Sequence, residues 1–414
     1  MRNSRRCETE RAAGHLGAIM KNRSLLKRLI IINILIVVAA ATALGQKSAN
    51  KPLHEIPFEY ELDKVIVPVE VNGKKTVRLI LDTGMPEGIF LMKPGAADDM
   101  ELSYVGANVM LRGAGPGTSS AKMAMDAELK LAGIAFSGQR VIVLNEEGPL
   151  SRTEWDGAIG ASVFNRFVVE IDVEKEMLRL YDPKAFDAGM AGSAIDLTLT
   201  RTKPHIQAAV NIEGVKEVPI LAIIDTGASA GLVISTARGW IAPANSIDAV
   251  LGSGVGGDVE GAVARAYSLS VGATKLKDIV VYFNRGEMPG DKEALIGMGV
   301  LNRFHVTFDY TAKKMFLKPN GRYEEPFEFN MTGLSVRPAK DGALEVVGVI
   351  KGSPASDAGV KKGDKVVSID GKKVSYSDFA KIIEEIRKPG IKIEVEFERE
   401  GKTFSRSLVS RRLL

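Results

Sequence analysis

The chain has 414 residues, and its 45% hydrophobic and 26% charged side chains are typical of globular domains. Its formal net charge of +4 arises at the N-terminus, because residues 1–45 carry eight Lys or Arg and two Asp or Glu. The rest of the chain carries 47 basic and 49 acidic side chains, so its charge of −2 argues against nucleic acid as a partner.

The number and spacing of the cysteine and histidine residues limit the disulfides and metal sites that the chain can form. The single cysteine, Cys7, lies near the N-terminus, which excludes disulfides and cysteine-based metal sites in the body of the protein. The four histidines (His15, His54, His205 and His305) are too scattered for the spacing of metal ligands, and we expect His205 and His305 to be structural. The sequence therefore predicts neither a metal nor a cofactor.

The N-terminus has the order of a secretory signal peptide. Four Lys or Arg between residues 21 and 28 precede an apolar run over residues 29–43, and Ala43-Leu44-Gly45 offers a cleavage site. We expect export to the periplasm or the extracellular space, with translation starting at Met1 or Met20. The alternative is an uncleaved membrane anchor over residues 29–45. We favour cleavage because the run is short for a membrane span and contains Asn33.

Two apolar runs each end in the triplet Asp-Thr-Gly. The runs at 77–81 and 221–224 predict short buried strands, and the triplets follow at 82–84 and 225–227. Further downstream, Ala158-Ile159-Gly160 matches Leu295-Ile296-Gly297, and each is followed by Asn-Arg-Phe, at 165–167 and 302–304. The offset is 143 residues at the triplets and 137 residues at the later glycines. This pattern predicts a duplicated domain, with one copy over residues 46–190 and the other over residues 191–325.

The doubled triplet predicts two carboxylates that face each other across the two copies. A close pair of carboxylates does not ionise twice easily, so one keeps its proton, and such a pair can hold and activate water. In each triplet the threonine, Thr83 or Thr226, can hydrogen-bond to the partner loop, and the glycine, Gly84 or Gly227, lets backbone approach the carboxylate. The alternative is an old duplication that is kept for stability alone.

A different module begins near Pro326. Its marks are Gly352-Ser353-Pro354-Ala355, Gly363-Asp364 and Ile369-Asp370-Gly371. Residues 375–387 predict an amphipathic helix that ends before Pro389-Gly390. Residues 391–397 and 403–409 predict a closing hairpin. We expect a third domain over residues 326–414.

Together these motifs resemble two known families. The two triplet units look like aspartic proteases of the retropepsin-like or pepsin-like group, and the block from Gly333 onward resembles a PDZ domain. The resemblance implies a mainly β protein: two retropepsin-like β-barrel domains related by pseudo-twofold symmetry, followed by a small α+β PDZ domain. It implies Asp82 and Asp225 as catalytic residues, and Gly160 and Gly297 as supports behind the active-site loops.

The same resemblance gives roles to two glycine-rich segments. Flaps that open for substrate are implied at Gly113, Gly115, Gly117, Gly252, Gly254 and Gly256. The alternative is that these segments are ordinary surface loops. One departure from the family is Met85, which follows the first triplet where a small residue is usual. A methionine there could pack harmlessly or crowd the cleft.

The PDZ-like module predicts a peptide-binding groove. An extended peptide would add as a strand beside Gly333, Leu334, Ser335 and Val336, with its C-terminal carboxylate near their backbone N–H groups and with Phe379 and Ile383 lining the groove. The alternative is that these apolar residues are core and that the module is a spacer.

The leading functional hypothesis is an exported aspartic endopeptidase that acts on polypeptides as a monomer. Its PDZ domain would bind peptide segments or protein C-termini, and any membrane contact would come from an uncleaved N-terminal segment. The second hypothesis is a catalytically inactive protein that binds peptides in the protease cleft and the PDZ groove. A third places each unit against its twin in another chain.

Overall fold

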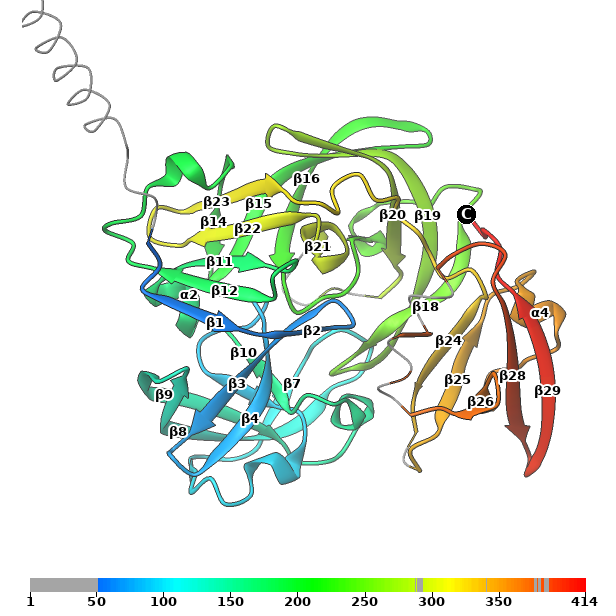
Figure 1. Cartoon of the computed structure of the whole chain (residues 1–414), viewed down its shortest axis with the longest axis horizontal. Helices are drawn as coiled ribbons and strands as arrows, with labels where there is room; N and C mark the ends of the chain where they lie inside the picture. Colours follow the sequence, from blue (N-terminus) through cyan, green and yellow to red (C-terminus); the bar gives the residue numbers. More distant parts are fainter. Residues whose placement is uncertain are drawn as a thin grey trace, which may run out of the picture. The chain divides into compact units, whose positions relative to one another are not determined.

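The computed structural model describes residues 51–286, 288, 293–339, 341–375, 378, 381–382 and 387–414. The chain divides into two compact units, Met1–Lys51 and Pro52–Leu414, and every described helix and strand lies in the second (Figure 1). The predicted signal segment and Cys7 lie outside the described residues. Within the described ranges, no helix has the length and apolar character that a membrane crossing needs.

The first lobe is one nine-stranded sheet. Its order is β2-β3-β4-β10-β5-β9-β8-β6, with β7 also paired to β8, and β3 pairs a second time with β8. The sheet therefore folds back on itself around apolar side chains. The strands are β2 (Glu59–Glu61), β3 (Lys64–Val71), β4 (Lys75–Leu81), β5 (Ile89–Leu91), β6 (Ser103–Tyr104), β7 (Val109–Leu111), β8 (Ser119–Leu131), β9 (Ile134–Leu144) and β10 (Gly157–Ile159).

The second lobe repeats this topology. Its order is β14-β15-β16-β21-β17-β20-β19-β18, and the second pairing of β15 with β19 corresponds to that of β3 with β8. The strands are β14 (Thr198–Thr200), β15 (Lys203–Ile212), β16 (Val215–Asp225), β17 (Leu232–Ser235), β18 (Ile247–Gly254), β19 (Gly257–Val271), β20 (Thr274–Asn284) and β21 (Ala294–Gly297). The shared strand order agrees with the duplication inferred from the motifs.

A third, six-stranded sheet, which no sequence motif predicts, joins the two lobes. Its order is β1-β12-β11-β22-β23-β13, and the lobes meet where β11 pairs antiparallel with β22, with Val169 opposite Phe308 (Figure 1). Beneath it, the ring of Phe164 packs edge-on against Phe308 at 5.4 Å. The strands are β1 (His54–Pro57), β11 (Val168–Asp172), β12 (Met177–Tyr181), β13 (Ser193–Asp196), β22 (Phe304–Asp309) and β23 (Lys314–Pro319).

The C-terminal module has its own sheet and its own core. Its strands run in the order β24-β25-β26-β28-β29, with β27 paired to β26, and the rings of Phe397 and Phe404 stack at 5.6 Å in the core. The bounds are β24 (Leu334–Pro338), β25 (Leu344–Val349), β26 (Lys365–Ile369), β27 (Lys372–Lys373), β28 (Lys392–Arg399) and β29 (Lys402–Val409). Most of the helix predicted over residues 375–387 lies outside the described residues.

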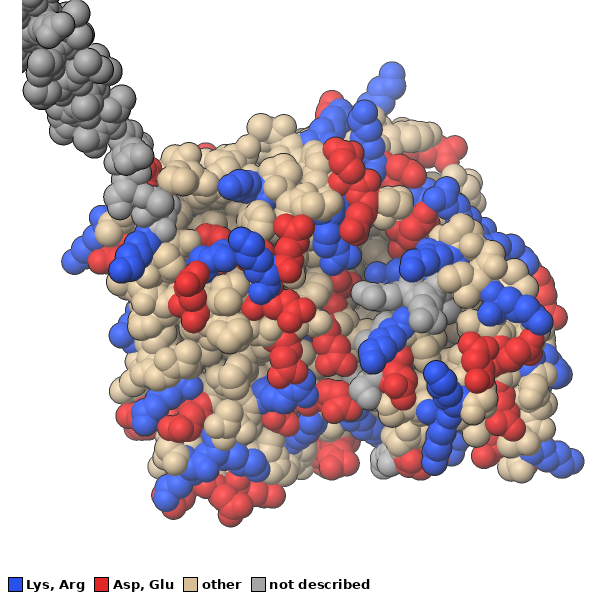
Figure 2. All heavy atoms as spheres, in the orientation of Figure 1, with Lys and Arg blue, Asp and Glu red and all other residues tan. Residues whose placement is uncertain are grey.

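The helices within the described residues are short. They are η1 (Pro94–Ala97), η2 (Pro149–Arg152), α2 (Ser162–Arg166), η3 (Ala188–Met190), η4 (Thr236–Arg238), α3 (Met298–Leu301) and α4 (Pro354–Asp357). The predictions of a mainly β protein and a C-terminal PDZ domain are confirmed. On the face in Figure 2, acidic and basic side chains are interspersed, in keeping with the near-neutral charge of residues 46–414.

Candidate active site

The two aspartates stand at equivalent places in the two lobes. Asp82 directly follows β4, Asp225 ends β16, and each of these strands pairs in parallel with the strand of the bracing segment, β10 or β21. The amide of Asp82 donates to the carbonyl of Ile159 at 2.9 Å, which fixes its backbone. The carboxyl groups of Asp82 and Asp225 are in hydrogen-bond contact and line one cavity of about 1250 Å³.

Thr83 and Thr226 form a reciprocal set of hydrogen bonds between the lobes. The amide of Thr83 donates to Thr226 Oγ1 at 3.0 Å, and the amide of Thr226 donates to Thr83 Oγ1 at 3.0 Å. Each hydroxyl donates onward, to the carbonyl of Ile224 at 2.7 Å and of Leu81 at 2.6 Å. Both threonines are at most 1% exposed, so this set is shielded from competing water. It fixes the distance between the two triplets.

Gly84 and Gly227 let each triplet approach the opposite carboxylate. Their amides donate to the aspartate of their own triplet, Gly84 to Asp82 Oδ1 at 2.7 Å and Gly227 to Asp225 Oδ1 at 3.0 Å. A Cβ on Gly84 would lie 2.7 Å from Asp225 Oδ2, and a Cβ on Gly227 would overlap the Asp82 carboxyl group. The glycine of the triplet is therefore a steric requirement of the aspartate pair.

The proton affinity of the pair differs from that of an ordinary aspartate. The pKa of Asp82 is raised from 3.8 to about 7, first by burial and next by the negative charge of Asp225, while the Gly84 amide and the Lys64 ammonium oppose the rise. Because the two groups share a hydrogen bond, the titration belongs to the pair. The pair therefore retains one proton at pH values where an isolated aspartate has lost its own.

Substituting Gly227 by Ala is expected to separate folding from activity. The added methyl group displaces the Asp82 carboxyl group, and a shift of about 1 Å in a reacting group costs about 100-fold in rate. We expect any reaction that depends on the aspartate pair to slow by at least that factor, while the far-ultraviolet circular dichroism spectrum stays unchanged. Gly148→Ala is the matched control, because nothing lies within 4 Å of a Cβ there. Equal activity of both variants would contradict the geometry.

The predicted supports Gly160 and Gly297 lie behind the two triplets. The amide of Gly160 donates to the carbonyl of Gly88 at 3.1 Å, and that of Gly297 donates to the carbonyl of Gly231 at 2.9 Å. A Cβ on Gly160 would overlap the carbonyl oxygen of Pro86, and a Cβ on Gly297 would overlap that of Ala230. Both positions thus bring two backbone segments into contact immediately behind the aspartates.

The two glycine-rich segments lie at hairpin tips that meet over the cavity. Gly113, Gly115 and Gly117 lie between β7 and β8, Gly252 and Gly254 lie in β18, and Gly256 lies between β18 and β19. The amide of Gly117 donates to the carbonyl of Gly256 at 2.8 Å, and the amide of Gly256 donates to the carbonyl of Ala114 at 2.7 Å. Both tips line the cavity that holds the aspartates, as flaps would.

Met85 both packs and faces the cleft. Its side chain is partly buried against an apolar cluster of the first lobe that includes Ile80 and Phe90, and it also lines the cavity. The packing agrees with the first of the two alternatives for Met85, and its place in the cavity lining leaves the second, crowding of the cleft, a prediction.

The PDZ domain contributes to the same cavity. Leu334, Ser335, Val336 and residues of the second flap hairpin all line it. Arg337 Nη1 contacts both carboxylate oxygens of Asp258 at 3.0 and 2.8 Å, which joins β24 to the flap strand β19. Among the described strands β24 pairs only with β25, and at its end the carbonyl of Pro338 accepts a hydrogen bond from Arg152 Nη1 at 3.3 Å.

Part of the predicted peptide site is already engaged within the domain. The amide of Gly333 donates to Asn330 Oδ1 at 3.0 Å, and the amide of Leu334 donates to Thr332 Oγ1 at 3.4 Å. A peptide carboxylate at these N–H groups would have to displace those two side chains. Phe379 and Ile383, the predicted groove residues, lie outside the described residues.

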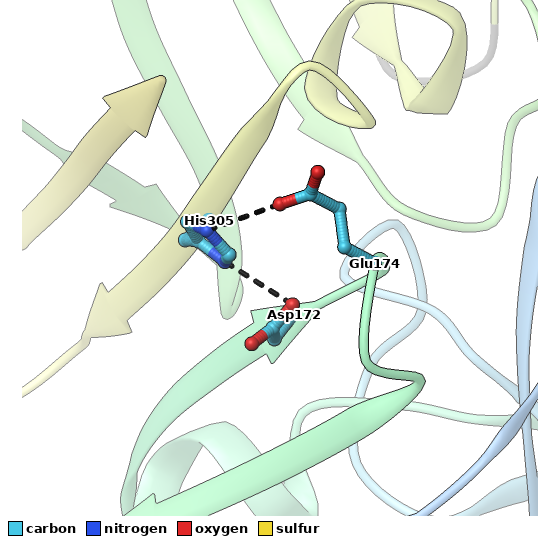
Figure 3. Close-up of side chains that lie close together, drawn as sticks. All are labelled: Asp172, Glu174 and His305. Atoms are coloured by element: carbon cyan, nitrogen blue, oxygen red, sulfur yellow. Dashed lines mark ion pairs between the residues drawn. The ribbon is translucent and has the colours of Figure 1, made fainter. Parts of the chain in front are cut away.

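A cluster of charged side chains that no sequence motif predicts lies at the seam between the lobes. His305 on β22 lies between Asp172, at 3.3 Å from Nδ1, and Glu174, at 3.5 Å from Nε2 (Figure 3). Asp172 also accepts from Arg179 at 3.1 Å, and Glu174 accepts from the amide of Gly321 at 2.9 Å. His305, which is expected to be structural, thus contacts two residues that lie 131 and 133 positions before it in the sequence. Linear spacing gives no signal for such a contact.

Two β lobes that each present one Asp-Thr-Gly at a common cleft define the retropepsin-like aspartyl protease class. Residues 67–163 and 208–300 match the aspartyl protease family model, and residues 345–399 match the PDZ domain model. The chain is therefore built from two aspartyl protease domains of this family and a C-terminal PDZ domain.

Two curated proteins share a shorter stretch with the chain. The carboxy-terminal processing protease CtpA of Bacillus subtilis (strain 168) is 33% identical over 81 residues, which are 19% of this chain and 17% of that protein. The putative zinc metalloprotease NMA0084 of Neisseria meningitidis serogroup A / serotype 4A (strain DSM 15465 / Z2491) is 44% identical over 57 residues, which are 14% of this chain and 12% of that protein. The chain thus spans less than a fifth of the length of these two relatives.

Proposed function

We propose that the protein is an aspartic endopeptidase in which Asp82 and Asp225 together activate water for peptide-bond hydrolysis. The observation that carries this proposal is the hydrogen-bonded contact of the two carboxyl groups in a cleft shared by both lobes. The family to which both lobes belong supports the same reaction.

The chemistry follows from a pair that holds one proton. The ionised carboxylate accepts a proton from water as the water oxygen attacks the carbonyl carbon, and the protonated carboxyl group donates to the carbonyl oxygen. The tetrahedral intermediate collapses when the C–N bond breaks and the leaving nitrogen takes up a proton. The flap tips, with Gly115 and Gly256 in contact, would close over the substrate and exclude bulk water.

The PDZ domain would present peptide segments to this cleft. Its strand β24 pairs only with β25 among the described strands and lines the same cavity as the aspartates, so a peptide added to β24 would lie next to the active site. Export remains a second proposal, supported by the order of residues 21–45. Action as a monomer is a third, supported by the presence of both aspartates in one chain.

The test is cleavage of an unfolded polypeptide by the full-length protein. We expect new peptide N-termini to appear when reduced, alkylated casein is the substrate, and EDTA should not prevent it. Because the pKa of Asp82 is raised to about 7, activity should fall as the pH rises through about 7 and both carboxyl groups ionise. No cleavage between pH 3 and pH 8, or loss of cleavage with EDTA, would overturn the proposal.

The position of Met85 at the cleft wall favours one alternative, a protein that binds peptides without cutting them. In that case, a peptide would bind with equal affinity to the wild type and to a variant in which both aspartates are Asn. Turnover would be absent at every pH. The casein assay and this binding measurement together distinguish the two functions.

A further inference from the structure

A lysine from the first lobe reaches the active-site loop of the second. Lys64 is the first residue of β3, and its Nζ donates to the carbonyl of Gly227 in the second triplet. The same side chain lines the cavity with Asp82 and Asp225. This contact therefore links the first lobe to the carbonyl of Gly227, a group that the threonine hydrogen bonds do not use.

The turn that delivers Lys64 is strained and is held in place. Leu62 and Asp63 have φ angles of +50° and +57°, a region that costs energy for residues with a Cβ. Ser229 Oγ of the second lobe donates to the carbonyl of Leu62 at 2.7 Å, and Asn302 Nδ2 of that lobe donates to Asp63 Oδ1 at 3.1 Å. These two contacts with the second lobe hold the turn in place and thereby fix the position of Lys64.

The ammonium of Lys64 is electrostatically coupled to the aspartate pair. Burial lowers the pKa of Lys64, while Asp225, Asp63 and Asp82 act in the opposite direction. In return, the positive charge of Lys64 lowers the pKa of Asp82. The phenol of Tyr310, whose pKa is raised by burial and by Asp82, is a further titratable group near Asp82, in addition to Asp225. The ammonium of Lys64 therefore interacts electrostatically with three carboxyl groups, those of Asp63, Asp82 and Asp225.

The second lobe contains a counterpart that lacks this contact. Lys203 is the first residue of β15 and follows a turn, Arg201-Thr202, with φ angles of +49° and +71°. It lines the same cavity, yet its side chain has no hydrogen bond or ion pair with any residue that the structure describes. The pseudo-twofold symmetry is thus broken at one lysine, and Lys203 provides an internal control.

We propose that Lys64 is a positioning residue of the aspartate pair. Its ammonium holds the Asp225-Thr226-Gly227 loop through the Gly227 carbonyl and places a positive charge beside the pair, which favours the singly ionised pair over the fully protonated one. The consequence for catalysis rests on the proposed function, since it would set the pH range in which the enzyme works. The electrostatic effect on the carboxyl groups does not depend on catalysis.

The first test measures the carboxyl groups directly. Full-length protein labelled with ¹³C at aspartate side-chain carboxyl carbons is titrated by NMR, and the signals of Asp82 and Asp225 are assigned with Asp→Asn variants. We expect Lys64→Met to move the titration of the pair upward by about one pH unit, because an opposite charge within a few ångströms lowers a carboxyl pKa by about 1–3 units. Lys64→Arg should titrate like the wild type, and so should Lys203→Met.

The second test is the pH profile of casein cleavage by the same variants. The profile of Lys64→Met should move toward higher pH by the same amount, whereas a merely structural role would lower kcat without moving the profile. Thermal unfolding verifies that each variant is folded, and Lys64→Arg replaces Lys64→Met if the latter is not. In that case, a wild-type titration in Lys64→Arg supports the proposal and a shifted titration contradicts it.

The outcomes separate the two proposals. Superimposable carboxyl titrations of the wild type and folded Lys64→Met would overturn the role of Lys64, whatever the activity. A shifted titration without casein cleavage by the wild type would keep the role of Lys64 in the pair and reject the endopeptidase.

Discussion

Replacing either Asp82 or Asp225 by Asn is expected to lower peptide hydrolysis by at least about 10³-fold, because general acid–base catalysis contributes about 10²–10⁴-fold and both roles need the pair. Asn holds no titratable proton, so neither variant can accept a proton from water and donate one to the carbonyl. The two substitutions should be about equally severe, since the carboxyl groups share one hydrogen bond. The measurement is the rate of casein cleavage at the optimal pH of the wild type.

The same substitution has a predictable effect on stability. The pKa of Asp82 is higher in the folded state than its ordinary value of 3.8, so the stability it contributes is present below about pH 3.8 and is lost as the pH rises through about 7. Asn removes this penalty, and Asp82→Asn should unfold at a higher temperature than the wild type at pH 8. Asp196→Asn is the control for loss of a carboxylate, because Asp196 on β13 forms an exposed ion pair with Lys314 on β23. A fully active Asp82→Asn or Asp225→Asn variant would refute the mechanism.

The second large effect is expected for Thr226→Val. Valine has nearly the same shape, but it leaves the amide of Thr83 without its acceptor and the carbonyl of Leu81 without its donor. Both groups lie at the buried junction of the lobes, and each unsatisfied buried group costs about 1–3 kcal/mol. We expect the free energy of unfolding to fall by about 2–5 kcal/mol, as measured by urea denaturation followed by near-ultraviolet circular dichroism.

Three further variants isolate the hydroxyl group as the cause. Thr226→Ser keeps the oxygen and should remain close to the wild type. Thr83→Val should resemble Thr226→Val, because the two side chains have equivalent partners in opposite lobes. The double Val variant should lose less than the sum of the two, since the four hydrogen bonds form one set. A loss below about 1 kcal/mol in Thr226→Val would show that the lobes do not depend on this contact.

Local repetition in the sequence was enough to predict the elements that carry the aspartates. The apolar runs lie directly before Asp82 and Asp225. The segments that contain Gly160 and Gly297 pair in parallel with these runs. Glycine is required at these positions, because a Cβ on Gly160 or on Gly227 would overlap neighbouring atoms. Because the same steric requirement occurs in both copies, the same residues recur in both copies, and the sequence therefore predicts the site.

Contacts between the copies left no such pattern. The pairing of β11 with β22 joins strands that are equally apolar in both copies, so nothing in their composition distinguishes a shared sheet from two separate ones. Lys64 could not be recognised either, since Lys203 stands at the same place after the same kind of turn and only one of them reaches a triplet. The hydrogen bond that the Gly333 amide donates to the Asn330 side chain is likewise a feature of one loop.

The sheet across the seam has a consequence for how the activity responds to dilution. Retropepsin-like units that sit on separate chains must associate before two aspartates can meet, and association costs translational and rotational freedom. Here β11 and β22 belong to one polypeptide, so their effective concentration is set by the connecting chain and is high at any protein level. The specific activity should therefore stay constant at dilutions where a two-chain enzyme would dissociate.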